Sequence, residues 1–259
     1  MQTGFQIGNF SIHWYGLIFA FAVAVAYSVI NKLSFCSTLS KKHIEASLYI
    51  ALIFGIFGAR FYHVADQWAY YSVNLIDIIK IWQGGIGIYG GLFGGLIGIL
   101  FYSFYKKFNP LLVFDLFSPA VLLAQAIGRW GNYFNQEAYG SPSNLPWAIK
   151  IDAVNRLRGF ENFQTFHPTF LYESILAVVA SAILIIVYRK NSQKIGLTVS
   201  LYLISYGLIR LFVEKFRIDT WQEGGIKIAQ IISLLFVFAG IVMLILIKKN
   251  LLQKKVDKI

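Results

Sequence analysis

The chain has 259 residues, a net charge of +11 and a mean hydropathy of +0.62, and only 14% of its residues are charged. Soluble domains carry about 25% charged residues, so this composition argues against a soluble protein and predicts one all-α polytopic membrane domain over residues 1–259. The single cysteine, Cys36, excludes an internal disulfide and a thiolate metal cluster, and no metal site is expected.

The first twelve residues, MQTGFQIGNFSI, contain no Lys or Arg. A secretory signal peptide starts with a basic segment, so we expect the first apolar segment to remain as a helix. Seven apolar segments approach the ~20 residues that a helix needs to cross a bilayer. They lie at about 13–30, 46–61, 86–105, 111–127, 170–188, 196–213 and 226–247.

The connections between these segments differ in charge. One set holds 13 basic and 3 acidic residues, and the other holds 10 basic and 9 acidic residues. The positive-inside rule predicts that the first set, which includes the C-terminal lysine tail, is cytoplasmic and that the N-terminus is outside. Topology and contact with anionic membrane lipids then account for the net charge, and no nucleic-acid partner is expected.

The longest outer connection, residues 128–169, lies between the fourth and fifth segments. It contains Pro142, Pro146 and Pro168, which interrupt helices. We therefore expect a small extracytoplasmic head at this point of the chain.

Arginines occur where an apolar helix should not carry them, at Arg60, Arg129 and Arg210. A charge inside a bilayer costs at least ~2.5 kcal/mol, so it normally faces a cavity and has a partner. Arg210 and Glu214 share one helix face with Tyr206 and Arg217. This stripe indicates either a polar cavity or an internal ion pair that fixes helix packing.

The predicted topology brings polar groups from five helices to one level of the membrane. Three arginines at that level favour an anionic ligand, because a guanidinium matches phosphate oxygens, and a phosphate at a bilayer is most simply a lipid head group. The other members of this set are His13, Trp14, Tyr15, Asn132, Asn135, Glu137, His167 and Glu173.

The third segment, GGIGIYGGLFGGLIG, repeats glycine at 87, 91 and 95 and at 90, 94 and 98. This spacing predicts close helix packing, and the bare backbone would also let a lipid approach. Tyr89 is the one polar side chain in the stretch.

Together these stretches resemble the bacterial prolipoprotein diacylglyceryl transferases. The most specific is GRWGNYFNQEAYG at 128–140. The others, in order, are HWYG at 13–16, GAR at 58–60, the glycine-rich third segment, HPTFLYE at 167–173 and YGLIRLFVEKFR at 206–217. The resemblance runs from about residue 5 to residue 247.

The resemblance implies a transferase at the outer face of the bacterial cytoplasmic (inner) membrane that takes the first step of lipoprotein maturation. Its donor is phosphatidylglycerol, its acceptor is the lipobox cysteine of a preprolipoprotein signal peptide, and its products are a thioether and glycerol 1-phosphate. No cofactor is implied. By motif, the catalytic residues are Arg129, Arg210, Tyr89 and Glu137, and the lipid-binding residues are Arg129, Asn132, Gly140, Tyr15, Arg60, Glu214 and His13.

The roles of these residues follow from the reaction that the resemblance implies. Arg129 and Arg210 would stabilise the leaving phosphate, Asn132 would hold the head group, and Glu137 would orient an arginine. The acceptor thiol has an ordinary pKa near ~8.5 and needs a base or a positive field. Some relatives carry a histidine where this chain has Tyr89. Three alternatives follow for the removal of the thiol proton. Tyr89 activated by arginines is the base, or His13 or His167 is the base, or the arginine field lowers the thiol pKa enough without a dedicated base.

Two other functions are weighed against this one. A CDP-alcohol phosphotransferase needs several aspartates holding divalent metal ions, but the aspartates here are dispersed along the chain. A lipid or anion transporter also uses arginine-lined cavities, but it often shows paired repeats and midplane sites, and neither is visible in the sequence.

Overall fold

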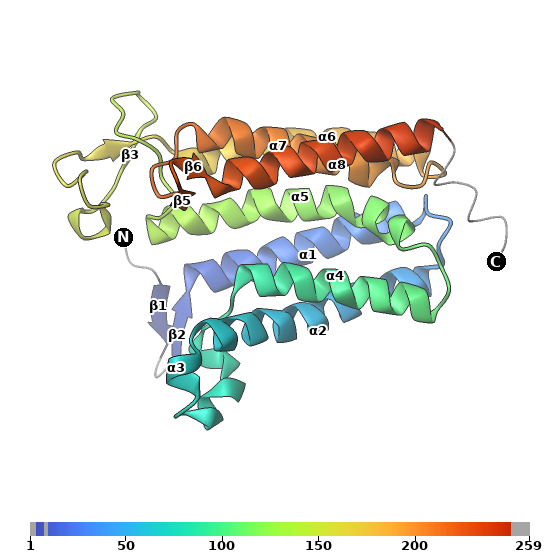
Figure 1. Ribbon diagram of the computed structural model, residues 1–259, viewed down its shortest axis with the longest axis horizontal. Helices are drawn as coiled ribbons and strands as arrows, with labels where there is room; N and C mark the ends of the chain where they lie inside the picture. Colours follow the sequence, from blue (N-terminus) through green and yellow to red (C-terminus); the bar gives the residue numbers. More distant parts are fainter. Residues whose placement is uncertain (1–3, 8–9, 250–259) are drawn as a thin grey trace. The chain divides into compact units, whose positions relative to one another are not determined.

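The structure is a computed structural model that describes residues 4–7 and 10–249 (Figure 1). Seven helices in this part of the chain are long and apolar enough to cross a membrane, which confirms the predicted number. They are α1 (Trp14–Ser34), α2 (Lys41–Asp66), α4 (Ile88–Tyr105), α5 (Pro110–Asn135), α6 (Thr169–Asn191), α7 (Leu197–Glu214) and α8 (Ile228–Lys248). The side of the membrane that each end faces stays a prediction.

Short elements precede α1 and lie between the helices. In the described part of the chain, three two-stranded antiparallel sheets pair β1 (Gly4–Ile7) with β2 (Phe10–His13), β3 (Ile149–Lys150) with β4 (Thr165–Phe166), and β5 (Gln222–Glu223) with β6 (Ile226–Lys227). The one-turn helix α3 (Trp68–Tyr71) and two 3₁₀ turns, Leu75–Ile79 and Ile81–Gln83, follow α2, and a third 3₁₀ turn, Ala153–Asn155, lies between β3 and β4.

The chain divides into two compact units. Among the described residues, the first unit comprises those up to residue 37 and residues 114–249, and the second comprises residues 38–113. The first unit therefore contains α1, most of α5, and α6 to α8, whereas α2, α3 and α4 form the second. The single membrane domain over 1–259 stays a prediction.

The second unit is built on direct backbone contact between α2 and α4. A Cβ atom added to Gly58 would lie 2.4 Å from the carbonyl oxygen of Gly90 and 2.9 Å from Cα of Gly94. The amide of Gly87 also donates to the carbonyl of Ala59 at 2.9 Å. The glycine spacing of the third apolar segment thus produces the close helix packing that it predicts.

In the first unit, Asp115 fixes the start of α7. This buried carboxylate near the beginning of α5 accepts hydrogen bonds from the amides of Gly196, at 2.5 Å, and Val199, at 2.8 Å. The first amides of a helix have no partner within the helix, so Asp115 supplies it from another element. Glycines also bring α7 against α8: a Cβ atom on Gly207 would lie 2.7 Å from the carbonyl oxygen of Ser233.

Helix α5 ends eight residues later than the apolar segment drawn from the sequence. Its last turns contain Arg129 and Asn132, so residues 128–135 are helical and the head begins at Gln136. The helix closes with a hydrogen bond from the amide of Glu137 to the carbonyl of Asn132, at 3.0 Å, while Gln136 has a positive φ of 52°. This is the geometry of a Schellman closure, in which the chain turns sharply away from the helix.

The side chain of Gln136 anchors this turn to the head. Its carbonyl oxygen accepts from the amide of Asp152 at 2.7 Å, and its amide nitrogen donates to the Asp152 carboxylate at 2.8 Å. The head has a core of its own around Tyr139, Ile151 and Phe166, which are all buried. The last helical turns of α5 are therefore closed by the Schellman geometry and anchored to the head through Gln136.

Candidate functional site

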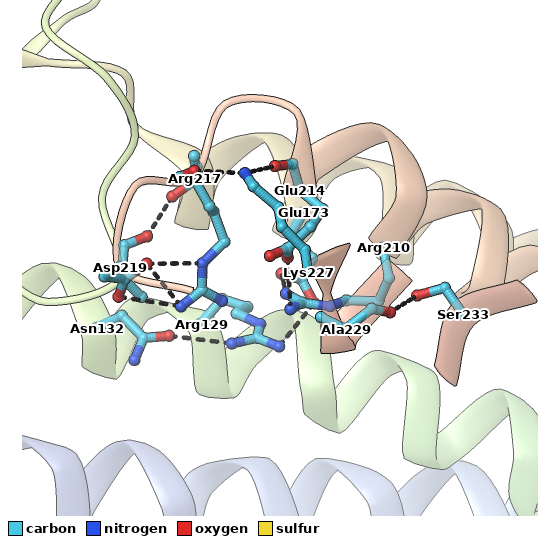
Figure 2. Close-up of polar contacts among 12 residues, drawn as sticks. Arg129, Asn132, Glu173, Arg210, Glu214, Arg217, Asp219, Lys227, Ala229 and Ser233 are labelled. Atoms are coloured by element: carbon cyan, nitrogen blue, oxygen red, sulfur yellow. Dashed lines mark hydrogen bonds and ion pairs between the residues drawn. The ribbon is translucent and has the colours of Figure 1, made fainter. Parts of the chain in front are cut away.

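Four charged side chains from three helices of the first unit form a continuous chain of ion pairs (Figure 2). Arg129 of α5 places Nη2 2.7 Å from Oε1 of Glu173 on α6. The other oxygen of Glu173 lies 3.1 Å from Nη1 of Arg210 on α7, and Nη2 of Arg210 lies 3.0 Å from Oε2 of Glu214. We call Arg129, Glu173, Arg210 and Glu214 the ion-pair chain.

The two arginines of the ion-pair chain differ in their surroundings. The Arg129 side chain is 25% exposed and has one carboxylate partner. Arg210 is 12% exposed and lies between two carboxylates, of which Glu214 is fully buried. A buried ion pair compensates its desolvation only while both partners are present. Arg129 is thus the arginine that an incoming anion can reach, whereas Arg210 is already neutralised on both sides.

Asn132 extends the ion-pair chain toward the head. Nη1 of Arg129 donates to Oδ1 of Asn132 at a long 3.4 Å, and the Asn132 amide nitrogen donates to the exposed carboxylate of Glu137 at 2.9 Å. Asn135 donates to the same Glu137 oxygen at 3.2 Å. Glu137 therefore orients two asparagines, and its expected influence on an arginine passes through Asn132.

Gly140 lies where the head meets the end of α7. Its amide donates to the carbonyl of His167 at 2.9 Å, and a Cβ atom added to it would lie 2.8 Å from Cβ of His167 and 3.0 Å from the carbonyl oxygen of Phe216. The backbones at this point leave no room for a side chain. This is a local reason for glycine at the end of the GRWGNYFNQEAYG stretch.

Lys227 and Arg217 complete the polar surroundings of α7. The ammonium group of Lys227 donates to the backbone carbonyls of Glu214, at 2.7 Å, and Arg217, at 2.8 Å (Figure 2). Arg217 forms a bidentate ion pair with Asp219: its Nε donates to Oδ1 at 2.9 Å and its Nη2 donates to Oδ2 at 3.0 Å. A cation at the C-terminal end of a helix also interacts favourably with the helix dipole.

Sequence reasoning did not place Lys227, Asp219 or the bridging role of Glu173 in the site. It named Glu173 only as one of the polar groups at the helix ends. The available signal was a glutamate early in an apolar helix, because two arginines buried in membrane helices require carboxylate partners. Nothing in the sequence identified which carboxylate each arginine would use.

Helix α1 brings Tyr15 against the end of α5. A Cβ atom on Gly131 would lie 2.6 Å from Cδ2 of Tyr15, so the tyrosine ring covers this glycine next to Asn132. The Tyr15 side chain is 42% exposed. His13 precedes α1, and its exposed side chain makes no capping hydrogen bond. Both predicted lipid-binding residues thus lie at the start of the same helix, and Tyr15 packs on Gly131 near the end of α5.

Arg60, which the sequence grouped with Arg129 and Arg210, has contacts of a different kind. Within the second unit, its guanidinium donates to the backbone carbonyls of Asp77, Ile78, Gly84 and Gly85. It also lies over the ring of Tyr71, 5.1 Å from the centroid. Four of its five N–H groups are therefore engaged in holding the connection between α2 and α4. The binding of a lipid phosphate by Arg60 stays a prediction.

The connection that Arg60 holds has a charge pair of its own. Nζ of Lys80 lies 2.6 Å from Oδ1 of Asp77, and the Tyr70 hydroxyl donates to Oδ2 at 2.6 Å. These hydrogen bonds from Lys80 and Tyr70 lower the pKa of Asp77 below its ordinary value. The lowered pKa favours the ionised form of Asp77, which is the form that pairs with Lys80 in the turn whose backbone carbonyl accepts from Arg60.

The candidate bases lie in different units. Tyr89, at the start of α4 in the second unit, is 57% exposed, and its ring centroid lies 6.3 Å from that of Tyr62. His167, in the first unit, has Nδ1 3.0 Å from the hydroxyl of Tyr172, which also accepts from Nε1 of Trp147 at 2.9 Å. Activation of Tyr89 by arginines stays a prediction.

Comparison with known proteins gives a consistent result over almost the whole chain. The family model described as prolipoprotein diacylglyceryl transferase matches residues 2–246. Proteins named phosphatidylglycerol–prolipoprotein diacylglyceryl transferase are similar: that of Synechocystis is 42% identical over 95% of this chain and 90% of its own length. The protein of Fervidobacterium nodosum is 40% identical over 91% of this chain and 81% of its own length. The protein of Finegoldia magna is 39% identical over 97% of this chain and 98% of its own length.

Proposed function

The chain belongs to the prolipoprotein diacylglyceryl transferase family, and on this premise we propose that it moves the diacylglyceryl group of phosphatidylglycerol to a preprolipoprotein. The acceptor is the cysteine thiol of the lipobox in the signal peptide. The observation that carries the proposal is Arg129: a partly exposed guanidinium at the end of a membrane-spanning helix, held by a buried carboxylate.

The reaction forms one bond and breaks one. The thiol sulfur attacks the glyceryl carbon that carries the phosphate, a C–S bond forms, and the bond between that carbon and the phosphate oxygen breaks. The thiol loses its proton, and glycerol 1-phosphate leaves with one more negative charge than the phosphate had in the lipid. Stabilising this developing charge is the main electrostatic task of the site.

Arg129 is suited to this task because its guanidinium can present two parallel N–H groups to a phosphate. Its contact with Asn132, at 3.4 Å, is weak enough for a phosphate oxygen to replace it. Asn132 then remains beside the head group, held by Glu137. Tyr15 packs on Gly131 in the same last turns of α5.

Arg210 acts differently in this proposal. Enclosed by Glu173 and Glu214, it contributes mainly by holding Glu173 in place, and its positive charge supports the leaving phosphate from behind. Gly140 keeps the head close to α7. The acceptor of the thiol proton remains open among Tyr89, His13, His167 and a thiol ionised by the arginine field alone.

The proposed place of the reaction is the outer face of the bacterial cytoplasmic membrane. Within the first unit, Arg129 lies near the end of α5, Glu173 near the start of α6 and Arg210 near the end of α7, so they share one end of these helices. The basic residues Arg189, Lys190 and Lys248 lie at the other ends of α6 and α8. The positive-inside rule supports assigning that second end to the cytoplasm.

The test is a transfer assay with the full chain in vesicles that contain phosphatidylglycerol labelled in its head-group glycerol. A lipobox peptide serves as acceptor, and the same peptide with serine in place of cysteine serves as the acceptor control. We compare the wild type with Arg129→Ala and with Arg158→Ala, an exposed arginine of the head.

Release of labelled glycerol phosphate should require the peptide cysteine and Arg129 but not Arg158. Intact phosphatidylglycerol with correctly inserted wild-type protein would contradict the proposal and would favour a transporter, which leaves its lipid unchanged.

A further inference from the structure

We propose that Glu173 is a positioning residue with two effects: it orients Arg129 toward the leaving phosphate, and it keeps the arginines from retaining that phosphate after the reaction. This inference rests on the transferase function proposed above. Glu173 ends the HPTFLYE stretch, but the sequence named it neither as catalytic nor as lipid-binding.

The geometry places Glu173 at the centre of the ion-pair chain. Its side chain is 5% exposed and uses its two oxygens separately, Oε1 toward Arg129 at 2.7 Å and Oε2 toward Arg210 at 3.1 Å. It therefore links α5 to α7 through α6. Arg210 has a second carboxylate in Glu214, whereas Arg129 has no other ion-pair partner among the described residues.

The first effect concerns the direction of the Arg129 guanidinium. A planar guanidinium held at one nitrogen by a fixed carboxylate presents its remaining N–H groups in a defined direction. Glu173 is itself buried and paired with Arg210, which restricts the positions that its carboxylate can take. Without it, Arg129 keeps its charge but gains rotational freedom, so the N–H groups lose their alignment with the leaving oxygen. The C–O bond would then break more slowly.

The second effect concerns charge. The ion-pair chain contains two cations and two anions, so it is neutral as built. Removing the Glu173 charge leaves two arginines opposite Glu214, and the net charge becomes +1 in a site with little solvent, where charges interact more strongly than in water. The released glycerol phosphate is more negative than the bound lipid. It would therefore gain more from the added positive charge than the substrate would.

Glu173→Gln tests both effects, because glutamine keeps the shape of the side chain and removes its charge. Its carbonyl oxygen can still accept from one arginine, but its amide nitrogen cannot accept from the other. We measure kcat, the KM for phosphatidylglycerol and the inhibition constant of added glycerol 1-phosphate, using the full-length enzyme in vesicles. The matched control is Glu223→Gln, an exposed glutamate of β5.

We expect kcat to fall about 100-fold, as for a misplaced catalytic group. We also expect glycerol 1-phosphate to inhibit about tenfold more strongly, since the site gains one net positive charge where charges interact more strongly than in water. Glu223→Gln should match the wild type in both. An unchanged kcat would overturn the proposal. So would a lower kcat with unchanged product inhibition, because a merely structural carboxylate would reduce activity without tightening product binding.

Glu173→Asp separates the two effects. It also tests the orienting role if Glu173→Gln does not insert into the membrane. It keeps the charge and shortens the side chain by one methylene group. We expect wild-type product inhibition with a reduced kcat, and a wild-type kcat would overturn the orienting role. Failure of the underlying function gives a different result, because the wild type itself would then release no glycerol phosphate.

Discussion

At the scale of single residues, the site distinguishes side chains of the same type by their partners. Arg129, Arg210 and Arg60 all lie in apolar helices, and the sequence treats them alike. The structure gives Arg129 one carboxylate and partial exposure, Arg210 two carboxylates, and Arg60 four backbone carbonyls. The chemical role of an arginine is therefore set by how many of its donors remain available.

Replacing Arg129 by lysine should remove most of the transferase activity. Lysine keeps the positive charge but offers a point charge in place of a planar fork, so it cannot bind a phosphate through two parallel hydrogen bonds. We expect kcat/KM to fall by at least about tenfold, the value of one charged hydrogen bond. The measurement is the vesicle transfer assay at matched levels of inserted protein. Full activity of Arg129→Lys would show that the fork geometry is not used.

Replacing Tyr89 by phenylalanine examines the proton acceptor. The substitution removes only the hydroxyl group, and Tyr89 is exposed at the start of α4, so the fold should tolerate it. If Tyr89 takes the thiol proton, the rate at neutral pH should fall by about 100-fold or more. His167→Gln, assayed in parallel, examines the second candidate. A wild-type rate in Tyr89→Phe would remove Tyr89 as the base.

At the scale of elements, buried side chains and glycines set the helix positions that make the site possible. Asp115 holds the first turn of α7 from α5, and Gly207 lets α7 approach α8. At the far end of α7, Lys227 bonds to the last carbonyls. The start of the helix that carries Arg210 is thus anchored by a residue distant in sequence, and the chain just after its end is anchored by Lys227.

Removing the Asp115 carboxylate, which contacts none of the four ion-pair residues, should destabilise the protein. Asp115→Ala leaves the amides of Gly196 and Val199 without their partner, and loss of such a cap costs about 1–2 kcal/mol. The thermal unfolding temperature of the purified protein in detergent should fall, and less so for Asp115→Asn, which keeps one acceptor. Asp66→Ala, at the exposed end of α2, is the control. Equal unfolding temperatures for Asp115→Ala and wild type would contradict the capping role.

At the scale of the whole molecule, the proposed orientation gives each end of the first unit a different environment. The ion-pair chain and the head lie at one end of α5, α6 and α7. Arg189 and Lys190 lie at the opposite end. Cys36 follows the last turn of α1, whose first turn packs through Tyr15 on Gly131 near the end of α5. The positive-inside rule places Cys36 in the cytoplasm.

Labelling of the single cysteine examines this orientation. In intact cells a membrane-impermeant maleimide should leave Cys36 unlabelled, and permeabilised cells should allow its labelling. A second variant, Cys36→Ser combined with Glu161→Cys in the exposed head, should be labelled in intact cells. The reverse pattern would place the active site on the cytoplasmic face and would contradict the proposed localisation.

The sequence by itself determined the class of protein, the seven membrane helices, the close helix packing of the glycine-rich segment and the family, because hydropathy, glycine spacing and motifs are local properties of the chain. That α2 is the packing partner of this segment came from the structure. It placed the end of α5 too early, since apolar character ends at Arg129 whereas the helix continues to the Schellman closure at Gln136. Only the tertiary structure decided that Glu173 joins Arg129 to Arg210, and that Arg60 holds a connection of its own unit. Such pairings depend on which helix ends meet and which side chain reaches which, and no pattern along the chain encodes that directly.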